Sequence, residues 1–313
     1  MLRSSRQPPG LLKHWAMTGM MFHLKGLVAA TGLALAAVSV ACAEPGGEPA
    51  GCAKSSAGRA TVAAVYDHST LILDDARVVR LAGVHFPLWT RTGGMAADPA
   101  RIVKAALAGW VLGRSVEILQ ERPGTDRYGR LVAQIRFEVD HRPAWVQALL
   151  AGEGLALIET GEGACAAALL AFERAAREAG KGFWGSGLFR VRQAREAAMM
   201  RGLVNTFQVV EGSIVGISES AGAIYVNFGS NWKSDFTAVI KRGRRADLKS
   251  VVQRLKQTRK QPVRVRGWLK WRNGPMIEIE APHQIEFVEG PYLPPSPGRS
   301  KDPFRSLPLP SHL

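Results

Sequence analysis

One order of elements occurs twice along this chain, and it constrains the fold more than any other feature of the sequence. Residues 61–185 carry three short strand-like runs, a helix near residues 99–112, and two further strand-like runs. Residues 203–288 repeat this order, with the helix at about 246–257. Short strands separated by turn residues are typical of a β-meander, and five strands with a helix after the third suit a closed barrel of the OB type. We therefore expect a mainly β protein with helices (α+β) that contains two OB-like barrels in series.

The segments around the two barrels differ from them in composition. Residues 44–60 are rich in small residues, glycine and proline, which predicts a linker. Residues 186–202 are basic and helix-prone, which predicts a helical connector between the barrels. Residues 289–313 are rich in proline, which predicts a disordered tail.

The first 43 residues have the pattern of a signal peptide. A basic stretch without acids precedes an apolar run over residues 26–40, and the small residues ACA follow it. This order is typical of a cleavable signal, so we expect an exported protein, periplasmic or secreted, with no transmembrane span in the mature chain. Two alternatives are a lipoprotein acylated at Cys42 and a retained N-terminal anchor. Translation from Met20 or Met21 would give a signal of more usual length.

Two cysteines remain after such a cleavage, Cys52 and Cys165. In an oxidising compartment this pair predicts a disulfide, and the alternative is two buried thiols. Closing a loop of more than a hundred residues would stabilise the fold by about 4–5 kcal/mol.

The positive charge of the chain is concentrated in the second predicted barrel. The formal net charge is +15 for all 313 residues. Residues 61–185 hold equal numbers of acidic and basic side chains, whereas residues 203–288 hold fourteen basic and seven acidic ones. An excess of this kind favours anionic partners such as nucleic acid, another polyanion or an anionic membrane surface.

Five motifs between residues 60 and 185 carry a family resemblance. In chain order they are DHST at 67–70, VRLAGVHFP at 79–87, TDRYGRLVA at 125–133, ALLAGEGLA at 148–156 and AREAGKGFWG at 176–185. In this order and spacing they resemble the thermonuclease (staphylococcal nuclease-like) family. The resemblance implies an OB-fold barrel and, for an intact family member, calcium-dependent hydrolysis of phosphodiesters in DNA and RNA.

The resemblance also assigns roles by motif position, and several positions depart from the family pattern. Arg80 and Arg130 match the two arginines that clamp the scissile phosphate, and both suit bidentate phosphate contacts. The metal-binding aspartates fall on Ser69 and His85, and the general base falls on Leu88. Calcium prefers several carboxylate oxygens, and leucine cannot accept a proton. We therefore expect no cofactor, with the calcium site lost and the family's hydrolysis lost or strongly impaired.

Several of these residues also have a second interpretation. His68 and His85 with Asp67 could form a rebuilt zinc site, or they are ordinary turn residues. Arg80 could pair with an acid such as Asp126 instead of a phosphate. Tyr128 could line a substrate pocket or pack against its neighbours.

The second barrel offers a predicted nucleic-acid face. Along the strand that begins near residue 263, two arginines and a tryptophan alternate with Val263, Val265 and Gly267, so one face of the strand is Arg-Arg-Trp. Basic grooves with stacking aromatic residues are typical of OB folds that bind single strands. The predicted substrate-binding residues there are Arg264, Arg266, Trp268, Lys270 and Arg272. The alternatives are a solvated face, contact with the first domain, and contact with anionic envelope surfaces.

Three functions of different classes remain open on this sequence. The first is an exported, degenerate nuclease-like protein that binds nucleic acid or another polyanion through the arginine clamp. The second is an active phosphodiesterase with an altered metal site. The third is an envelope protein-interaction module that holds a protein partner.

Overall fold

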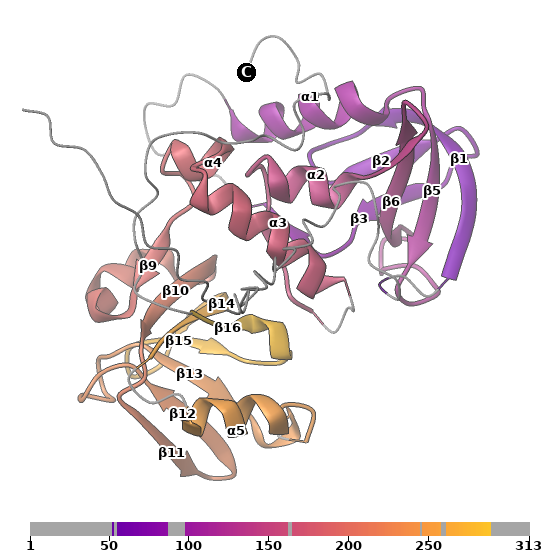
Figure 1. The fold of residues 1–313 in the computed structure, drawn as a ribbon. Coiled ribbons are helices and arrows are strands. Elements are labelled where there is room, and N and C mark those ends of the chain that lie inside the picture. Colours follow the sequence, from indigo (N-terminus) through magenta and orange to yellow (C-terminus); the bar gives the residue numbers. More distant parts are fainter. Residues whose placement is uncertain are drawn as a thin grey trace, which may run out of the picture. The chain divides into compact units, whose positions relative to one another are not determined.

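The structure is a computed structural model that describes Cys52 and residues 55–86, 98–161, 165–244, 246–257 and 261–288 (Figure 1). The predicted signal segment, Leu88 and the predicted tail lie outside these residues. The described residues all belong to one unit, Ala43–Leu313. None of the helices within them is long and apolar enough to cross a membrane.

The first barrel closes as the repeated strand–helix order predicts. The strand β1 pairs antiparallel with both β2 and β5, and β3 pairs antiparallel with β2 and parallel with β6. Because β6 also pairs with β5, the five strands form a closed sheet. Its elements are β1 (Ser55–Val65), β2 (Thr70–Leu73), β3 (Val78–Leu81), α1 (Pro99–Val111), β5 (Ser115–Gln120) and β6 (Leu131–Val139).

Local sequence explains the start of α1 and the orientation of β3. The Asp98 carboxylate caps α1 by accepting a hydrogen bond from the backbone nitrogen of Ala100 at 3.0 Å, and Pro99 opens the helix. Along β3, Val79 and Leu81 are buried. Because side chains alternate between the two faces of a strand, Arg80 between them is exposed.

Three helices and two short strand pairings complete the first lobe, by which we mean the first barrel together with the elements up to α4. The strand β4 pairs with β8, and β7 extends the sheet from β6. Gly154 follows α2 with φ +67, and a Cβ there would collide with the backbone carbonyl of Lys181, so the position requires glycine. The bounds are β4 (Val84–His85), β7 (Arg142–Trp145), α2 (Val146–Gly152), β8 (Leu157–Ile158), α3 (Ala166–Glu178) and α4 (Gly182–Gly185).

The predicted disulfide is present between Cys52 and Cys165, which are 113 residues apart in sequence. It ties the segment before β1 to the residue that precedes α3. Both cysteines are buried in the hydrophobic core of the first lobe.

The second lobe repeats the strand order of the first. Its sheet runs β11-β12-β13-β15-β14-β10, with β13 and β15 parallel. Only two residues separate β10 from β11, so the sheet returns on itself, as the OB-type prediction requires. The bounds are β10 (Phe207–Ser213), β11 (Gly216–Ser220), β12 (Ala223–Asn227), β13 (Thr237–Ile240), α5 (Lys249–Gln257), β14 (Pro262–Trp271), β15 (Pro275–Glu278) and β16 (Ile285–Phe287).

Two predicted boundary segments differ from expectation. The strand β1 begins at Ser55, inside the range expected to be a linker, because its residues pair with β5. The expected helical connector contains β9 (Val191–Gln193), which pairs parallel with β10, followed by a 3₁₀ helix at Ala194–Leu203. A partner strand that is distant in sequence therefore decides the conformation of each segment.

Candidate nucleic-acid interface

The two arginines of the predicted phosphate clamp come from neighbouring segments of the first barrel. Arg80 lies opposite Val132 in the parallel β3–β6 pair, and Arg130 precedes Val132 by two residues. On its other side Arg80 lies opposite Thr70 of β2. Arg80 is exposed, and within the described part of the chain its side chain makes no hydrogen bond or ion pair. The alternative pairing of Arg80 with Asp126 is not formed.

Asp126 instead holds Arg130 in place. Its carboxylate accepts hydrogen bonds from the backbone nitrogens of Tyr128 and Arg130 at 2.9 and 3.0 Å, and from Arg130 Nε at 2.9 Å. Burial raises the pKa of Asp126, but the hydrogen bonds and charge of Arg130 outweigh it and bring the pKa below its usual value. The guanidinium of Arg130 is thereby ordered before any ligand arrives.

Tyr128 lies at the tip of the same loop and is 66% exposed, so it does not pack into the core. The guanidinium carbons of Arg127 and Arg130 lie 4.9 and 5.1 Å from the centre of its ring. An exposed aromatic ring with cations close to it can stack on a base while the cations contact phosphates.

The turn before β2 uses Asp67 and Ser69 for its own structure. The Asp67 carboxylate accepts hydrogen bonds from the backbone nitrogen and the hydroxyl of Ser69 at 2.7 and 3.0 Å. Burial raises the pKa of Asp67, but the bonds from Ser69 outweigh it, so the pKa lies below its usual value. Ser69 therefore offers a neutral oxygen whose proton is already donated within the turn.

His85 is enclosed by aromatic rings of the second barrel. Its ring centre lies 4.8 Å from that of Phe207 and 5.0 Å from that of Trp268. Burial, together with the positive charges of Arg80 and His68, lowers the pKa of His85 to about 4. His85 is therefore a neutral packing residue at neutral pH.

The corner of the first barrel that carries Ser69, Arg80, His85 and Arg130 does not offer calcium the oxygen ligands that it prefers. The two metal positions of the family hold Ser69 and His85, and neither side chain supplies a carboxylate. No three His, Cys, Asp or Glu side chains in the described ranges are grouped to hold a metal ion. The alternative zinc site of His68, His85 and Asp67 is therefore wrong for these residues, and His68 packs instead against Phe86, with 4.9 Å between ring centres.

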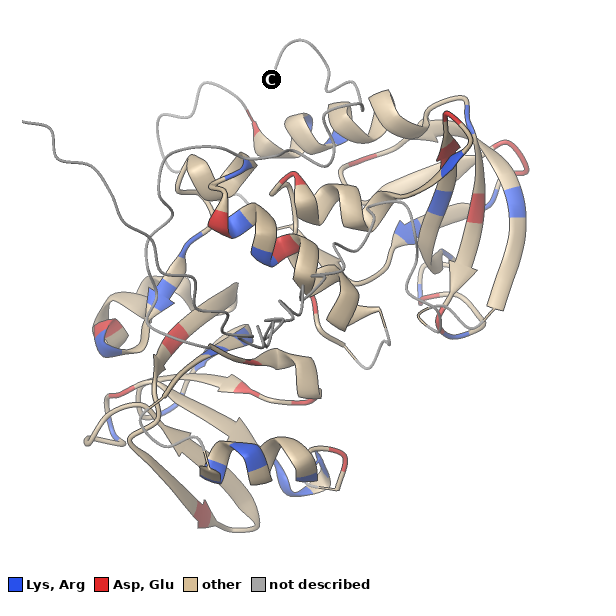
Figure 2. Cartoon of the chain, in the orientation of Figure 1, with Lys and Arg blue, Asp and Glu red and all other residues tan. Residues whose placement is uncertain are grey.

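Two residues of the predicted face on β14 are buried, which corrects the expectation of an open Arg-Arg-Trp surface. Arg266 is 1% exposed and makes a bidentate ion pair with Glu173 of α3, at 2.8 and 3.0 Å. Arg264 pairs with Glu211 at 2.6 Å and with Glu286 at 2.8 Å. The charged positions of α3 lie in the second half of the helix, in the order acid, base, base, acid (Figure 2). The strand pattern showed which residues share a face, but the carboxylates that cover this face come from distant segments.

The remaining predicted residues of that strand have different surroundings. Trp268 is 43% exposed and contacts His85. Lys270 pairs with Glu278 at 2.7 Å. Arg272 follows the strand, is exposed, and has no hydrogen-bond or ion-pair partner for its side chain among the residues described. Of the five residues predicted here, Arg272 is thus the most available to an anionic ligand.

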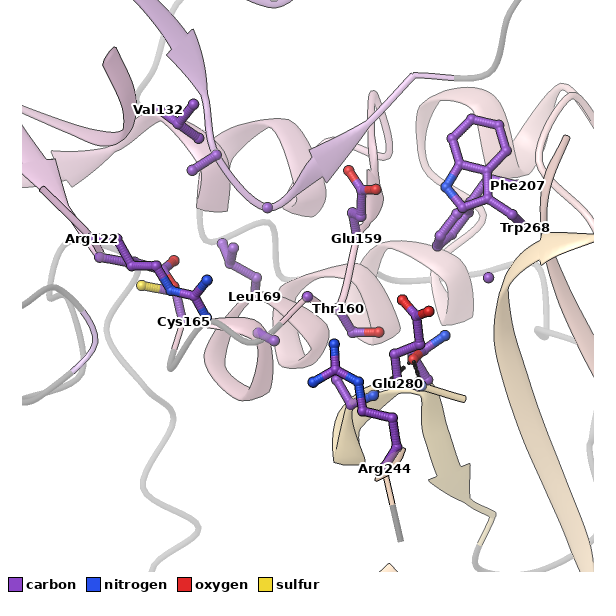
Figure 3. Close-up of a pocket in the computed structure, with 18 residues that line it drawn as sticks. Arg122, Val132, Glu159, Thr160, Cys165, Leu169, Phe207, Arg244, Trp268 and Glu280 are labelled. Atoms are coloured by element: carbon purple, nitrogen blue, oxygen red, sulfur yellow. Dashed lines mark hydrogen bonds between the residues drawn. The ribbon is translucent and has the colours of Figure 1, made fainter. Parts of the chain in front are cut away.

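A pocket of about 570 Å³ beside this corner was not foreseen from the sequence (Figure 3). Its charged lining consists of three glutamates and two arginines, namely Glu121, Glu159, Glu280, Arg122 and Arg244. The hydroxyl of Thr160 on its wall is buried and has no hydrogen-bond partner among the residues that the structure describes. Because acids outnumber bases here, the pocket does not favour a polyanion.

Comparison with known families agrees with the barrel geometry. Residues 78–186 match the family model described as staphylococcal nuclease homologue. Among curated proteins none matches this chain. The matched segment starts at β3 and ends just after α4, so β1, β2 and the whole second barrel lie outside it. The chain therefore contains a staphylococcal nuclease-like domain, whose closed five-stranded barrel carries the Arg80–Arg130 corner.

Proposed function

We propose that this protein is an exported nucleic-acid-binding protein that uses Arg80 and Arg130 as a phosphate clamp and does not perform the family's calcium-dependent hydrolysis. A nuclease-like barrel is consistent with a nucleic-acid ligand, and the basic second barrel adds long-range attraction for a polyanion. The disulfide supports an oxidising compartment, as export requires.

One observation carries the proposal. Arg80 is exposed beside Arg130 with no carboxylate partner in the described residues, whereas the metal positions next to it hold Ser69 and His85. An arginine side chain that has no ion-pair partner can donate its hydrogen bonds to a phosphate. Loss of the general base by itself would slow hydrolysis by about 10²–10⁴-fold.

Binding and cleavage can be separated in one experiment. The purified protein is incubated with labelled single-stranded DNA and RNA in calcium, in zinc and in chelator, and each sample is read for retention and for cleavage. We expect retention without cleavage, and we expect it to weaken as salt rises because bound phosphates release counterions.

Variants identify the residues responsible. Arg80→Ala and Arg130→Ala should each weaken retention, whereas Arg101→Ala, which removes the same charge from an exposed position of α1, should leave retention unchanged. Cleavage that disappears in the two clamp variants would establish the altered phosphodiesterase instead. Absence of retention at low salt would overturn the proposal and leave the envelope protein-interaction module.

A further inference from the structure

A groove of about 700 Å³ lies on the second barrel, on strands that the nuclease-like domain does not include. Its floor is the outward face of β11, β12, β13 and β15. Ile224 and Val226 of β12 point the other way, into the hydrophobic core. The groove is therefore a feature of the sheet surface and not a defect in core packing.

The strand register places the floor residues in two rows. The first row runs across four strands through Ser218, Tyr225, Val239 and Glu278. The second runs through Asn227, Thr237 and Met276. Neighbouring positions in such a row are about 5 Å apart, so the floor offers hydroxyl, amide and aromatic groups side by side.

The rim of the groove carries an exposed aromatic ring. Trp232, in the connection between β12 and β13, is 58% exposed. The ammonium of Lys233 lies 5.6 Å from the centre of its ring. A tryptophan held in the open beside a cation is a stacking platform for a planar ligand.

Two unpaired arginines complete the rim. Arg242 follows β13, and Arg272 lies in the turn between β14 and β15. Both are exposed, and neither side chain has a hydrogen-bond or ion-pair partner among the described residues. Gly222 in the β11–β12 turn leaves room for Arg242, because a Cβ there would lie 2.9 Å from Arg242 Cδ.

The carboxylate in the groove does not repel an anion, because lysines already neutralise it. Glu278 accepts ion pairs from Lys241 at 2.8 Å and from Lys270 at 2.7 Å. Arg242 and Arg272 therefore supply most of the net charge at the groove, and the two lysines add the positive charge by which they exceed Glu278. The electrostatics of the groove therefore select an anionic ligand.

We propose that this groove binds single-stranded nucleic acid, with a base stacked on Trp232 and backbone phosphates held by Arg242 and Arg272. Stacking on the exposed tryptophan requires an unstacked base, which a duplex does not present. Two cations beside an aromatic ring suit a single strand, whose bases and phosphates follow one another along the chain. The site rests on the proposed function, because it names a second place on the chain where the same class of ligand binds.

The test is a fluorescence-anisotropy titration of a labelled oligothymidylate with the whole protein at several salt concentrations. Trp232→Ala should weaken binding by about 5- to 150-fold, the range for one stacked base, and Trp232→Phe should restore most of it. Arg242→Ala/Arg272→Ala should reduce the slope of log affinity against log salt by about 1.4, or about 0.7 for each lost phosphate contact.

The matched control is Lys249→Ala/Lys256→Ala, which removes the same charge from exposed positions of α5 outside the groove. It should leave the salt slope unchanged. If binding persists unaltered in the groove variants but is lost in Arg80→Ala, the groove proposal is overturned and the proposed function stands. If the unaltered protein shows no binding, both fail together.

Discussion

Replacing Arg266 with methionine is expected to destabilise the protein strongly, because Arg266 joins β14 of the second barrel to α3 of the first. Its guanidinium donates to both oxygens of Glu173 at 2.8 and 3.0 Å and to the carbonyl oxygen of Ile158 at 3.3 Å. Glu173 is fully buried, and it also accepts a hydrogen bond from the backbone nitrogen of Ile158 at 2.8 Å. Methionine keeps most of the side-chain volume, so loss of the charge is the main effect.

The magnitude follows from the bonds that are lost. Two hydrogen bonds between charged partners contribute about 1.5 kcal/mol or more each, which gives at least about 3 kcal/mol. Removal of one partner from a buried ion pair typically costs about 3–5 kcal/mol, since the other charge stays buried. Arg177 Nη1, which lies 3.1 Å from Glu173 in the unaltered protein, leaves the carboxylate one cationic partner in the variant, and this favours the lower end of the range.

Urea unfolding followed by tryptophan fluorescence and circular dichroism measures the effect. Arg272→Met is the matched control, because Arg272 is exposed just after the same strand, and its free energy of unfolding should change by less than about 0.5 kcal/mol. Arg266→Met/Glu173→Gln should recover stability relative to Arg266→Met, with a coupling energy of about 0.5–3 kcal/mol. A loss below about 1 kcal/mol in Arg266→Met would refute the reasoning.

Two further predictions concern pH and redox state. The folded pKa of His85 is about 4 against an ordinary 6.5, so its contribution to stability is present above pH 6.5 and lost as pH falls toward 4. Between pH 7 and pH 5 this contribution amounts to about 2 kcal/mol. Urea unfolding at both pH values should therefore show a smaller change in the free energy of unfolding for His85→Phe than for the unaltered protein, by about 2 kcal/mol. Equal pH dependence in the two proteins would contradict the assignment. Reduction of the Cys52–Cys165 disulfide, which spans 113 residues, should lower the free energy of unfolding by about 4–5 kcal/mol. Unfolding with and without reductant measures this, and an unchanged midpoint would show that the cross-link contributes nothing.

The two barrels were predictable because their information is local. Short strands separated by turn residues, and a helix opened by Asp98-Pro99, are set by backbone propensity and capping within a few residues. The boundary segments were less predictable. Residues 55–60 and 191–193 become strands only because β5 and β10 offer them free edges, and those partners are far away in sequence.

The candidate site was predictable only in part, for a related reason. Motif spacing placed Arg80, Arg130, Ser69 and His85 at one corner of the first barrel, and the β2–β3–β6 pairing supports that placement for Arg80. Nothing in the sequence indicated that aromatic rings of the second barrel would enclose His85. The pairing of Asp126 with Arg130, and not with Arg80, depends on a loop conformation that spacing alone does not fix.

Strand alternation, cysteine positions and motif order belong to the chain alone, so they were enough to predict the two barrels, the Cys52–Cys165 pair and the chemical identity of the residues around Arg80. Which charged residues remain available to a ligand depends instead on tertiary packing. Arg264 and Arg266 alternate with apolar residues just as a solvent-facing pair would, yet Glu173, Glu211 and Glu286 neutralise and bury them. The availability of a charged side chain depends on what packs over it. Here the carboxylates that cover the two arginines lie 20 to 93 residues away from them in sequence.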